Sequence, residues 1–155
     1  MRYRRANAAG ATYFFTVNLA DRRSRMLLER VAELRSAVRL VQSRHRFDII
    51  AWVVLPDHLH AIWTLPPDDA DFSTRWALIK AGFSRQISAD EPIGTSRRQK
   101  DLRPHVDYIH YNPVKHGHVS IASEWPHSTI HRYIRAGLMT ADWAAPQADA
   151  FVAGE

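Results

Sequence analysis

The chain contains no cysteine, and this absence excludes disulfide bonds, thiolate metal sites and a cysteine nucleophile. No apolar run is long enough to cross a bilayer, and the N-terminal segment 1–5 leads into no signal-like apolar stretch. We therefore expect a cytoplasmic protein, in a reducing compartment, that does not associate with a membrane.

Lysine is scarce as well. Among the 21 basic residues 18 are arginine, and the only lysines are Lys80, Lys100 and Lys115. The formal net charge is +5. Arginine binds phosphate through two parallel hydrogen bonds and stacks on bases, so this bias favours a nucleic-acid partner. An arginine-rich proteome would produce the same bias, and composition alone does not separate the two explanations.

The pattern of apolar residues predicts a single α+β domain over residues 1–143, followed by a loose tail over 144–155. The predicted strands, rich in β-branched and aromatic residues, cover 12–19, 48–55 and 58–65. The predicted helices, with apolar residues at helical spacing, cover about 27–46 and 73–87. This order is that of a ferredoxin-like split β-α-β unit, with the helices on one face of the sheet.

The fourth strand of such a unit is not evident. It should lie in segment 88–101, which is polar and basic and shows no strand pattern, so we expect an exposed loop there. A helix is predicted over 102–111, with Pro104 allowed in its first turn and Pro113 ending it. The sequence thus predicts a sheet whose fourth strand could be missing.

Two histidines one residue apart, His58 and His60, begin the third predicted strand. Because successive side chains of a strand point to opposite faces, these two imidazoles share one face. Neutral imidazoles placed together can bind a divalent metal ion. Two hydrogen-bonded histidines on a sheet surface would give the same pattern, so the pair alone is a weak signal.

Tyr108 lies in the helix predicted over 102–111, called the tyrosine helix below, and Asn112 follows it at the spacing of one helical turn. The Asn112 amide oxygen could join two histidines at a metal ion and leave positions for phosphate and water. A phenol has a pKa of about 10, so a tyrosine nucleophile needs a base or a nearby cation. Tyr111 is the competing nucleophile, but at about 100° per residue it points away from Asn112. Both residues also have a purely structural explanation. Asparagine is common before a proline at the end of a helix, and tyrosine is common at the edge of an apolar core.

Basic residues outside these pairs are candidate contacts to phosphate groups. His116 with Lys115 is expected to contact phosphate and not metal, because the end of the predicted helix separates them from the ligand face. Any one of these residues, taken alone, is better explained as a solvated charge. The full set of candidate DNA contacts is Arg4, Arg5, Arg22, Arg23, Arg97, Arg98, Lys115 and His116.

Four blocks of the sequence occur in the order of a known family. They are YRRANAAGATYFFTVNLADRRSRML, AWVVLPDHLHAIWTLP, DFSTRWALIKAGFSR and HVDYIHYNPVKHGHV. Together they resemble the REP-associated tyrosine transposases of the single-tyrosine HUH superfamily, over most of residues 3–143. The resemblance implies a ferredoxin-like fold. It also implies a reaction that cleaves and rejoins single-stranded DNA without an external source of energy.

The resemblance also implies roles for individual residues. His58 and His60 would be the HUH histidines, Asn112 the third metal ligand, and Tyr108 the nucleophile that forms a 5′-phosphotyrosine link and frees a 3′-hydroxyl. The implied metal is Mg²⁺ or Mn²⁺, with no small-molecule cofactor. The implied partner is a hairpin from repeated extragenic palindromes with a short guide tetranucleotide, bound by a nucleoid-associated monomer or homodimer.

One block of the family is not found in this chain. Relatives carry a stretch of the type W-Q-x-x-F-W-E-H before the tyrosine helix, whereas here Gln99 to His105 runs almost directly into that helix. We therefore expect a missing strand, lower stability and slow or absent cleavage. Two other functions stay open: a decayed relative that binds DNA hairpins without cutting them, and a metal-dependent phosphodiesterase that uses water.

Overall fold

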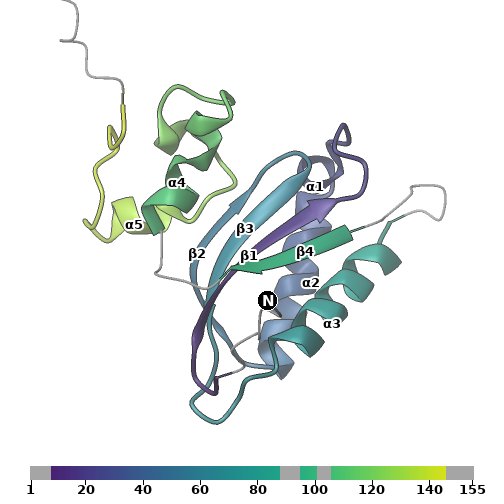
Figure 1. Ribbon diagram of the computed structural model, residues 1–155. Helices are drawn as coiled ribbons and strands as arrows, with labels where there is room; N and C mark the ends of the chain where they lie inside the picture. Colours follow the sequence, from purple (N-terminus) through teal and green to yellow (C-terminus); the bar gives the residue numbers. More distant parts are fainter. Residues whose placement is uncertain (1–7, 88–94, 101–105, 146–155) are drawn as a thin grey trace, which may run out of the picture.

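The computed structural model describes residues 8–87, 95–100 and 106–145, with the segment 95–100 described by its backbone only. All but two residues of the expected loose tail therefore lie outside the described residues. The described part forms one sheet with helices on both faces (Figure 1). None of its helices is both long enough and apolar enough to span a membrane.

A four-stranded antiparallel sheet forms the centre of the fold (Figure 1). Its strands are β1 (Thr12–Leu19), β2 (Asp48–Val54), β3 (His58–Thr64) and β4 (Thr95–Lys100). They lie in the order β2-β3-β1-β4 across the sheet. This order, with helices between β1 and β2 and between β3 and β4, is that of a ferredoxin-like unit, so the predicted α+β class is confirmed.

The fourth strand, which no pattern in the sequence indicates, is present as β4. It pairs antiparallel with β1, from Phe14 opposite Lys100 to Leu19 opposite Thr95. Its sequence, TSRRQK, shows no alternation of apolar residues. A strand can form without it, because strands pair through backbone N–H and C=O groups, and charged residues are common on edge strands. The expectation of an unpaired β1 edge is wrong, and the argument for low stability and slow cleavage loses its basis.

Three helices cover one face of the sheet: α1 (Met26–Glu29), α2 (Val31–Arg44) and α3 (Phe72–Arg85) (Figure 1). Alternate side chains of β1 and β3 face them, among them the fully buried Phe15 and Trp63, which pack against Trp76 of α3. Helix α3 begins at Phe72, slightly before its predicted cap at residue 73 or 74. Asp71 is the N-cap, and its side chain accepts a hydrogen bond from the Thr74 N–H at 2.9 Å.

The opposite face carries α4 (Val106–Lys115), the 3-10 helix η1 (Ala122–Glu124) and α5 (Ile130–Arg135) (Figure 1). The two helices of the predicted ferredoxin-like unit, α2 and α3, share one face as expected, whereas the later helices lie on the other face. Ile109 of α4 and the neighbouring Trp125 join a second apolar cluster with Phe14 and Ile62 of the sheet. Their burial explains the arrangement, because this face of the sheet is apolar and needs a cover of its own.

Helix α4 continues through Pro113 to Lys115, although the proline was expected to end it. Proline removes one N–H donor from the helix, but residues after it can still donate. The His116 N–H does so, to the carbonyl of Asn112 at 3.0 Å. The predicted start of this helix lies outside the described residues.

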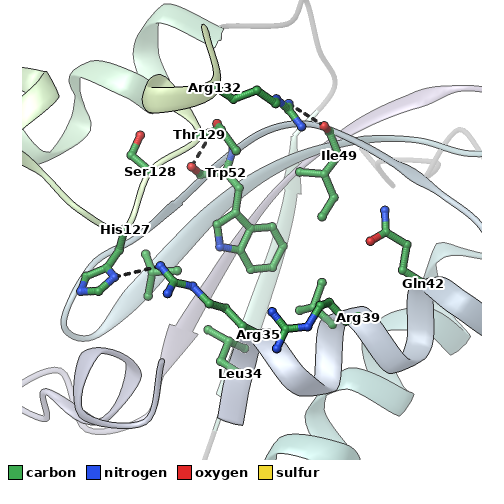
Figure 2. A pocket seen from close by; sticks show the side chains of 12 residues that line it. Leu34, Arg35, Arg39, Gln42, Ile49, Trp52, His127, Ser128, Thr129 and Arg132 are labelled. Carbon is green, nitrogen blue, oxygen red and sulfur yellow. Dashed lines mark hydrogen bonds between the residues drawn. The ribbon is translucent and has the colours of Figure 1, made fainter. Parts of the chain in front are cut away.

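Residues 127–129 cover the outer edge of β2 (Figure 2). The Val54 N–H donates to the His127 carbonyl at 2.9 Å, and the Thr129 N–H donates to the Trp52 carbonyl at 2.9 Å. An uncovered strand edge is a template for pairing with another chain. This segment therefore protects the sheet and attaches the C-terminal helices to it.

Candidate functional site

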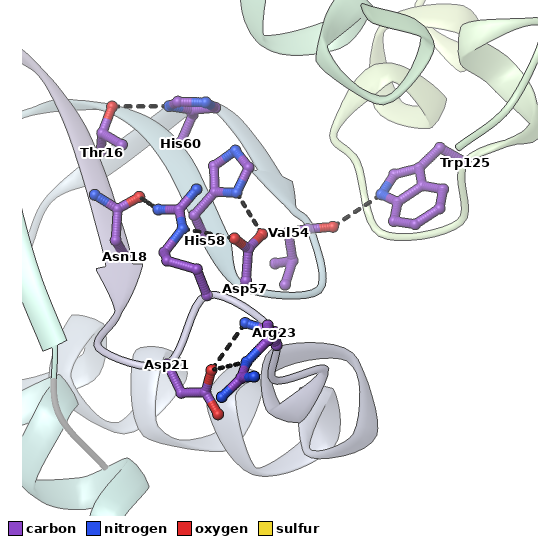
Figure 3. Close-up of polar contacts among 10 residues, drawn as sticks. Thr16, Asn18, Asp21, Arg23, Val54, Asp57, His58, His60 and Trp125 are labelled. Atoms are coloured by element: carbon purple, nitrogen blue, oxygen red, sulfur yellow. Dashed lines mark hydrogen bonds and ion pairs between the residues drawn. The ribbon is translucent and has the colours of Figure 1, made fainter. Parts of the chain in front are cut away.

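His58 and His60 lie side by side on the face of β3 that α4 covers (Figure 3). Each residue is 5% exposed, and their ring centroids are 5.1 Å apart. The alternation of the strand places both imidazoles on one face, as the sequence predicts. Phe14 of β1 stacks against His60 with ring centroids 5.5 Å apart, so the pair is packed on its inner side by an aromatic ring.

One ring nitrogen of each histidine is held by a neighbour. The His58 Nδ1–H donates to Asp57 Oδ1 at 2.7 Å, and His60 Nδ1 shares a hydrogen bond with the Thr16 hydroxyl at 2.9 Å. Thr16 reaches His60 because the two residues are opposite one another in the β1–β3 register. These contacts orient both rings and leave Nε2 of each as the nitrogen that can bind a ligand.

Asp57 connects His58 to Arg22. Its second carboxylate oxygen pairs with Arg22 Nε at 2.7 Å, and the same guanidinium donates to Asn18. Burial alone raises the pKa of Asp57, but the hydrogen bond from His58 and the charges of His58 and Arg22 outweigh it and hold the pKa below its ordinary value. The carboxylate is ionised at neutral pH and keeps the His58 proton on Nδ1.

His60 is neutral in this environment. Burial, followed by the charges of His58, His116 and Lys115, lowers the pKa of His60 to about 3, although a polar contact with Asn112 acts in the opposite direction. A neutral imidazole is the form that binds a metal ion. At neutral pH the pair therefore offers ligand nitrogens without first losing a proton at His60.

Tyr108, Asn112 and Lys115 lie on the face of α4 that is turned to the histidines. The Tyr108 ring is 5.6 Å from the His60 ring, and Tyr108 is 38% exposed. Lys115 Nζ is 4.9 Å from the centre of the Tyr108 ring. The buried Ile109 anchors the helix on the sheet, so the phenol is held beside the imidazole and stays accessible.

Asn112 is fully buried, and its side-chain amide is not satisfied. Within the part of the chain that the structure describes, neither its Oδ1 nor its Nδ2 has a hydrogen-bond partner of normal geometry. A buried unpaired polar group costs about 1–3 kcal/mol, so its presence calls for an explanation. The residues described hold no group of three His, Cys, Asp or Glu that could bind a metal ion. A donor set of two imidazoles and one amide, as the sequence suggests, stays a prediction.

His116 lies closer to the histidine pair than the sequence predicts. Its ring centroid is 5.2 Å from that of His58. The expectation that the end of the helix keeps His116 away from the ligand face is wrong, because α4 runs on to Lys115. Burial, followed by the charges of His58 and Lys115, lowers the pKa of His116. Its contact with phosphate stays a prediction.

The other predicted DNA contacts are only partly described. The Arg23 side chain is 95% exposed and pairs with Asp21 at 3.6 Å. Arg4 and Arg5 lie outside the described residues, and the strand that carries Arg97 and Arg98 is described by its backbone. Phosphate contacts by these residues stay predictions. Arg22 differs from them, because its ion pair with Asp57 makes it part of the support of the histidines.

Two supporting residues are missed by sequence reasoning, which takes Asp57 only as a turn residue. A carboxylate directly before the first histidine is a usable signal, since metal-binding imidazoles commonly donate their other N–H to a carboxylate. Thr16 has no local signal, because only the pairing of β1 with β3 brings it to His60.

Two buried imidazoles are expected to make the fold sensitive to acid. Burial, followed by the charges of Arg132 and His131, lowers the pKa of His110 to about 4, and the pKa of His60 is about 3. Both rings are neutral in the folded chain and take up a proton on unfolding once the pH is below about 6.5. The free energy of unfolding should therefore fall as the pH decreases below that value, by up to about 1.4 kcal/mol per pH unit for each histidine.

Urea unfolding of the wild type and of His110→Gln, from pH of about 7 to about 4.5, measures this dependence. We expect the variant to lose part of the slope. His45→Gln changes an exposed histidine at the end of α2 and should keep the wild-type slope. Equal slopes for all three proteins would show that buried His110 does not control the acid response.

The geometry can be compared with known proteins. The chain is 48% identical over 159 residues to the REP-associated tyrosine transposase of Escherichia coli (strain K12), covering 99% of this chain and 96% of that protein. A solved structure of a REP-associated tyrosine transposase bound to a REP hairpin matches with a TM-score of 0.84 and 45% identity, over 100% of this chain and 97% of the other. No family model matches the chain.

The alignment with the Escherichia coli protein extends over 159 residues, whereas the chain has 155, so only a few residues of that protein have no counterpart here. The pairing of β4 with β1 shows that the fourth strand itself is not missing. Sequence identity over nearly the full length shows that the chain belongs to the REP-associated tyrosine transposase family.

Proposed function

We propose that this chain cleaves and rejoins single-stranded DNA beside a hairpin, with Tyr108 as the attacking nucleophile. The observation that carries the proposal is the position of the phenol, which is accessible and 5.6 Å from the ring of the buried His60. The solved relative is bound to a REP hairpin, which supports hairpin DNA as the partner of this chain as well.

The residues around Tyr108 fit a divalent metal ion. His58 and His60 would bind it through Nε2, and Asn112 through Oδ1, which gives a reason for a buried amide without a hydrogen bond of normal geometry among the described residues. Two imidazoles and an amide suit Mn²⁺, and Mg²⁺ when phosphate and water complete its ligands. A bound ion would polarise the scissile phosphate and offset its charge. Because none of the three ligands is anionic, we expect weak metal binding without DNA.

The chain's own residues account for the bonds made and broken. The Tyr108 oxygen bonds to phosphorus while the bond from phosphorus to the 3′ oxygen breaks. The phenol loses its proton to solvent, and the departing 3′ oxygen gains one. Lys115, whose Nζ is 4.9 Å from the centre of the Tyr108 ring, would stabilise the negative charge on the phosphate. Attack by a 3′-hydroxyl on the phosphotyrosine reverses these steps and rejoins the strand.

A covalent-adduct assay tests the proposal. The wild-type protein is incubated with Mn²⁺ and a hairpin that carries a labelled single-stranded flank, and the products are separated on a denaturing gel. A labelled band at the size of protein linked to DNA supports the proposal. Cut DNA without linked protein would indicate a phosphodiesterase that uses water, and retardation on native gels alone would indicate a binding protein. Either of these two results would contradict the proposal.

Asp57→Asn is expected to slow adduct formation by about 10- to 100-fold and to raise the Mn²⁺ concentration needed for half-maximal rate. The amide cannot fix the proton on His58 Nδ1 as the carboxylate does, and Arg22 loses its ion pair. Initial rates over a series of Mn²⁺ concentrations measure both effects. Asp21→Asn, an exposed carboxylate paired with Arg23, is the matched control. A slower rate with an unchanged Mn²⁺ dependence would contradict the positioning role.

A further inference from the structure

A second site for DNA is suggested by a cavity of about 270 Å³ beside β2 (Figure 2). It lies on the helix α2 side of the sheet, whereas Tyr108 and the histidines belong to the side covered by α4. Its walls come from α2, from β2 and from residues 127–132, the segment that covers the edge of β2. No residue of the cavity belongs to the site described above.

The floor of the cavity is apolar and contains the Trp52 indole, with Leu34 and Ile49 beside it (Figure 2). Trp52 is partly exposed and nearly parallel to the buried Trp63, at an interplanar angle of 5° and a centroid distance of 6.4 Å. The packed rings behind Trp52 hold it in place. A fixed, partly exposed indole offers a flat surface on which a nucleobase can stack.

Arginines surround this floor, and no acidic residue lines the cavity. Arg35 contacts Nδ1 of His127 at 3.1 Å, and Arg132 donates to the Ile49 carbonyl at 2.8 Å. Arg39 makes no hydrogen bond or ion pair with another described residue. Three guanidinium groups without a carboxylate among them are suited to bind a phosphate.

We infer that this cavity binds one nucleotide of the single-stranded flank, with the base on Trp52 and a phosphate at the arginines. The volume is just below the usual lower limit of about 300 Å³ for small-molecule pockets, so it suits one base and not a larger cofactor. Arg35 and Arg39 are exposed, so the single-stranded DNA can continue beyond the cavity on either side. The inference rests on the proposed function in taking DNA as the partner.

Thr129 connects the cavity to the tyrosine helix. It lines the cavity, its hydroxyl donates to the Trp52 carbonyl at 3.2 Å, and it shares a hydrogen bond with His110 Nε2 of α4 at 2.9 Å. One wall of the cavity is thus in direct contact with the helix that carries Tyr108. A nucleotide held here would fix the flank relative to that helix.

Equilibrium binding of two DNAs tests the inference, one a hairpin with a single-stranded flank and the other the same hairpin with blunt ends. Arg39→Ala is expected to weaken binding of the flanked hairpin by about 5- to 10-fold and to leave the blunt hairpin unchanged. Arg44→Ala removes an exposed guanidinium of α2 outside the cavity and should not discriminate between the two DNAs. Melting curves check that each variant is folded.

Photocross-linking locates the base directly. A 5-iodouracil is placed at each flank position in turn, and cross-linked peptides are identified by mass spectrometry. We expect one position to cross-link to Trp52, with a lower yield in Arg39→Ala. Cross-links that map only to other residues, or an Arg39→Ala protein that binds the flanked hairpin as Arg44→Ala does, would overturn the inference.

Two further arms separate the possible causes of failure. A free mononucleotide that quenches Trp52 fluorescence and is not displaced by the flanked hairpin would show that the ligand is a free nucleotide, which overturns the inference. If the wild type binds neither hairpin, the proposed function fails first and the inference falls with it. If the wild type binds both hairpins equally, only the inference fails.

Discussion

Tyr108→Phe is expected to abolish the covalent protein–DNA adduct and to leave hairpin affinity within about twofold of the wild type. The substitution removes the nucleophilic oxygen and keeps the ring, which packs 6.2 Å from Phe14 and 5.6 Å from His60. Because Tyr108 is 38% exposed, loss of its hydroxyl should cost little stability. Adduct formation on denaturing gels and affinity on native gels, measured with the same labelled hairpin, separate chemistry from binding.

Tyr111→Phe is the matched control, since Tyr111 is on the same helix and is 41% exposed. It lies outside the face that Tyr108 shares with Asn112, and no ring contact joins it to His58 or His60 among the described residues. Its variant should form the adduct at close to the wild-type rate. If Tyr111→Phe loses the adduct and Tyr108→Phe keeps it, the nucleophile is Tyr111 and the proposed role of Tyr108 is wrong.

The local parts of the candidate site follow from sequence spacing. Residues two apart on a strand and four apart on a helix share a face whatever the rest of the fold does, so the pairs His58–His60 and Tyr108–Asn112 could be placed in advance. The structure brings the two pairs together, with the Tyr108 ring next to His60. The roles of these residues stay predictions.

Contacts between distant segments are not available from spacing. Thr16 meets His60 through the register of β1 on β3, which pairs two residues 44 positions apart in the sequence. Strand β4 is polar and is missed because an edge strand is held by its backbone, which sequence patterns do not report. The position of α4 on the second face depends on buried Ile109, which belongs to an apolar cluster with Phe14 of β1 and Ile62 of β3.

Rules for single residues also fail where neighbours compensate. Proline disfavours a helix because it lacks an N–H donor. In α4, however, the helix continues past Pro113, and the His116 N–H still donates to the Asn112 carbonyl. The extra turn carries Lys115 and His116 to the site. An expected helix end at Pro113 therefore misplaces His116, which the structure puts next to His58.

Asn112→Leu is expected to raise thermal stability and to abolish metal-dependent cleavage. Neither polar atom of the buried Asn112 amide has a hydrogen-bond partner of normal geometry among the described residues, so an apolar side chain of similar shape removes a cost of about 1–3 kcal/mol. For a chain of this size we expect the melting temperature without metal to rise by about 3 °C or more. Adduct formation should fall by about 100-fold or more, since the metal loses one of its three protein ligands.

Asn112→Asp completes the test, because it keeps an oxygen ligand but adds a buried negative charge. We expect it to melt below the wild type without metal and to be stabilised by Mn²⁺, since a ligand that binds only the folded chain raises its melting temperature. The wild type should gain less from Mn²⁺, and Asn112→Leu nothing. Chelation with EDTA should remove the Mn²⁺ effect and the adduct together. If Asn112→Leu melts below the wild type and gains as much from Mn²⁺, then Asn112 is a packing residue and the metal site must be built from other groups.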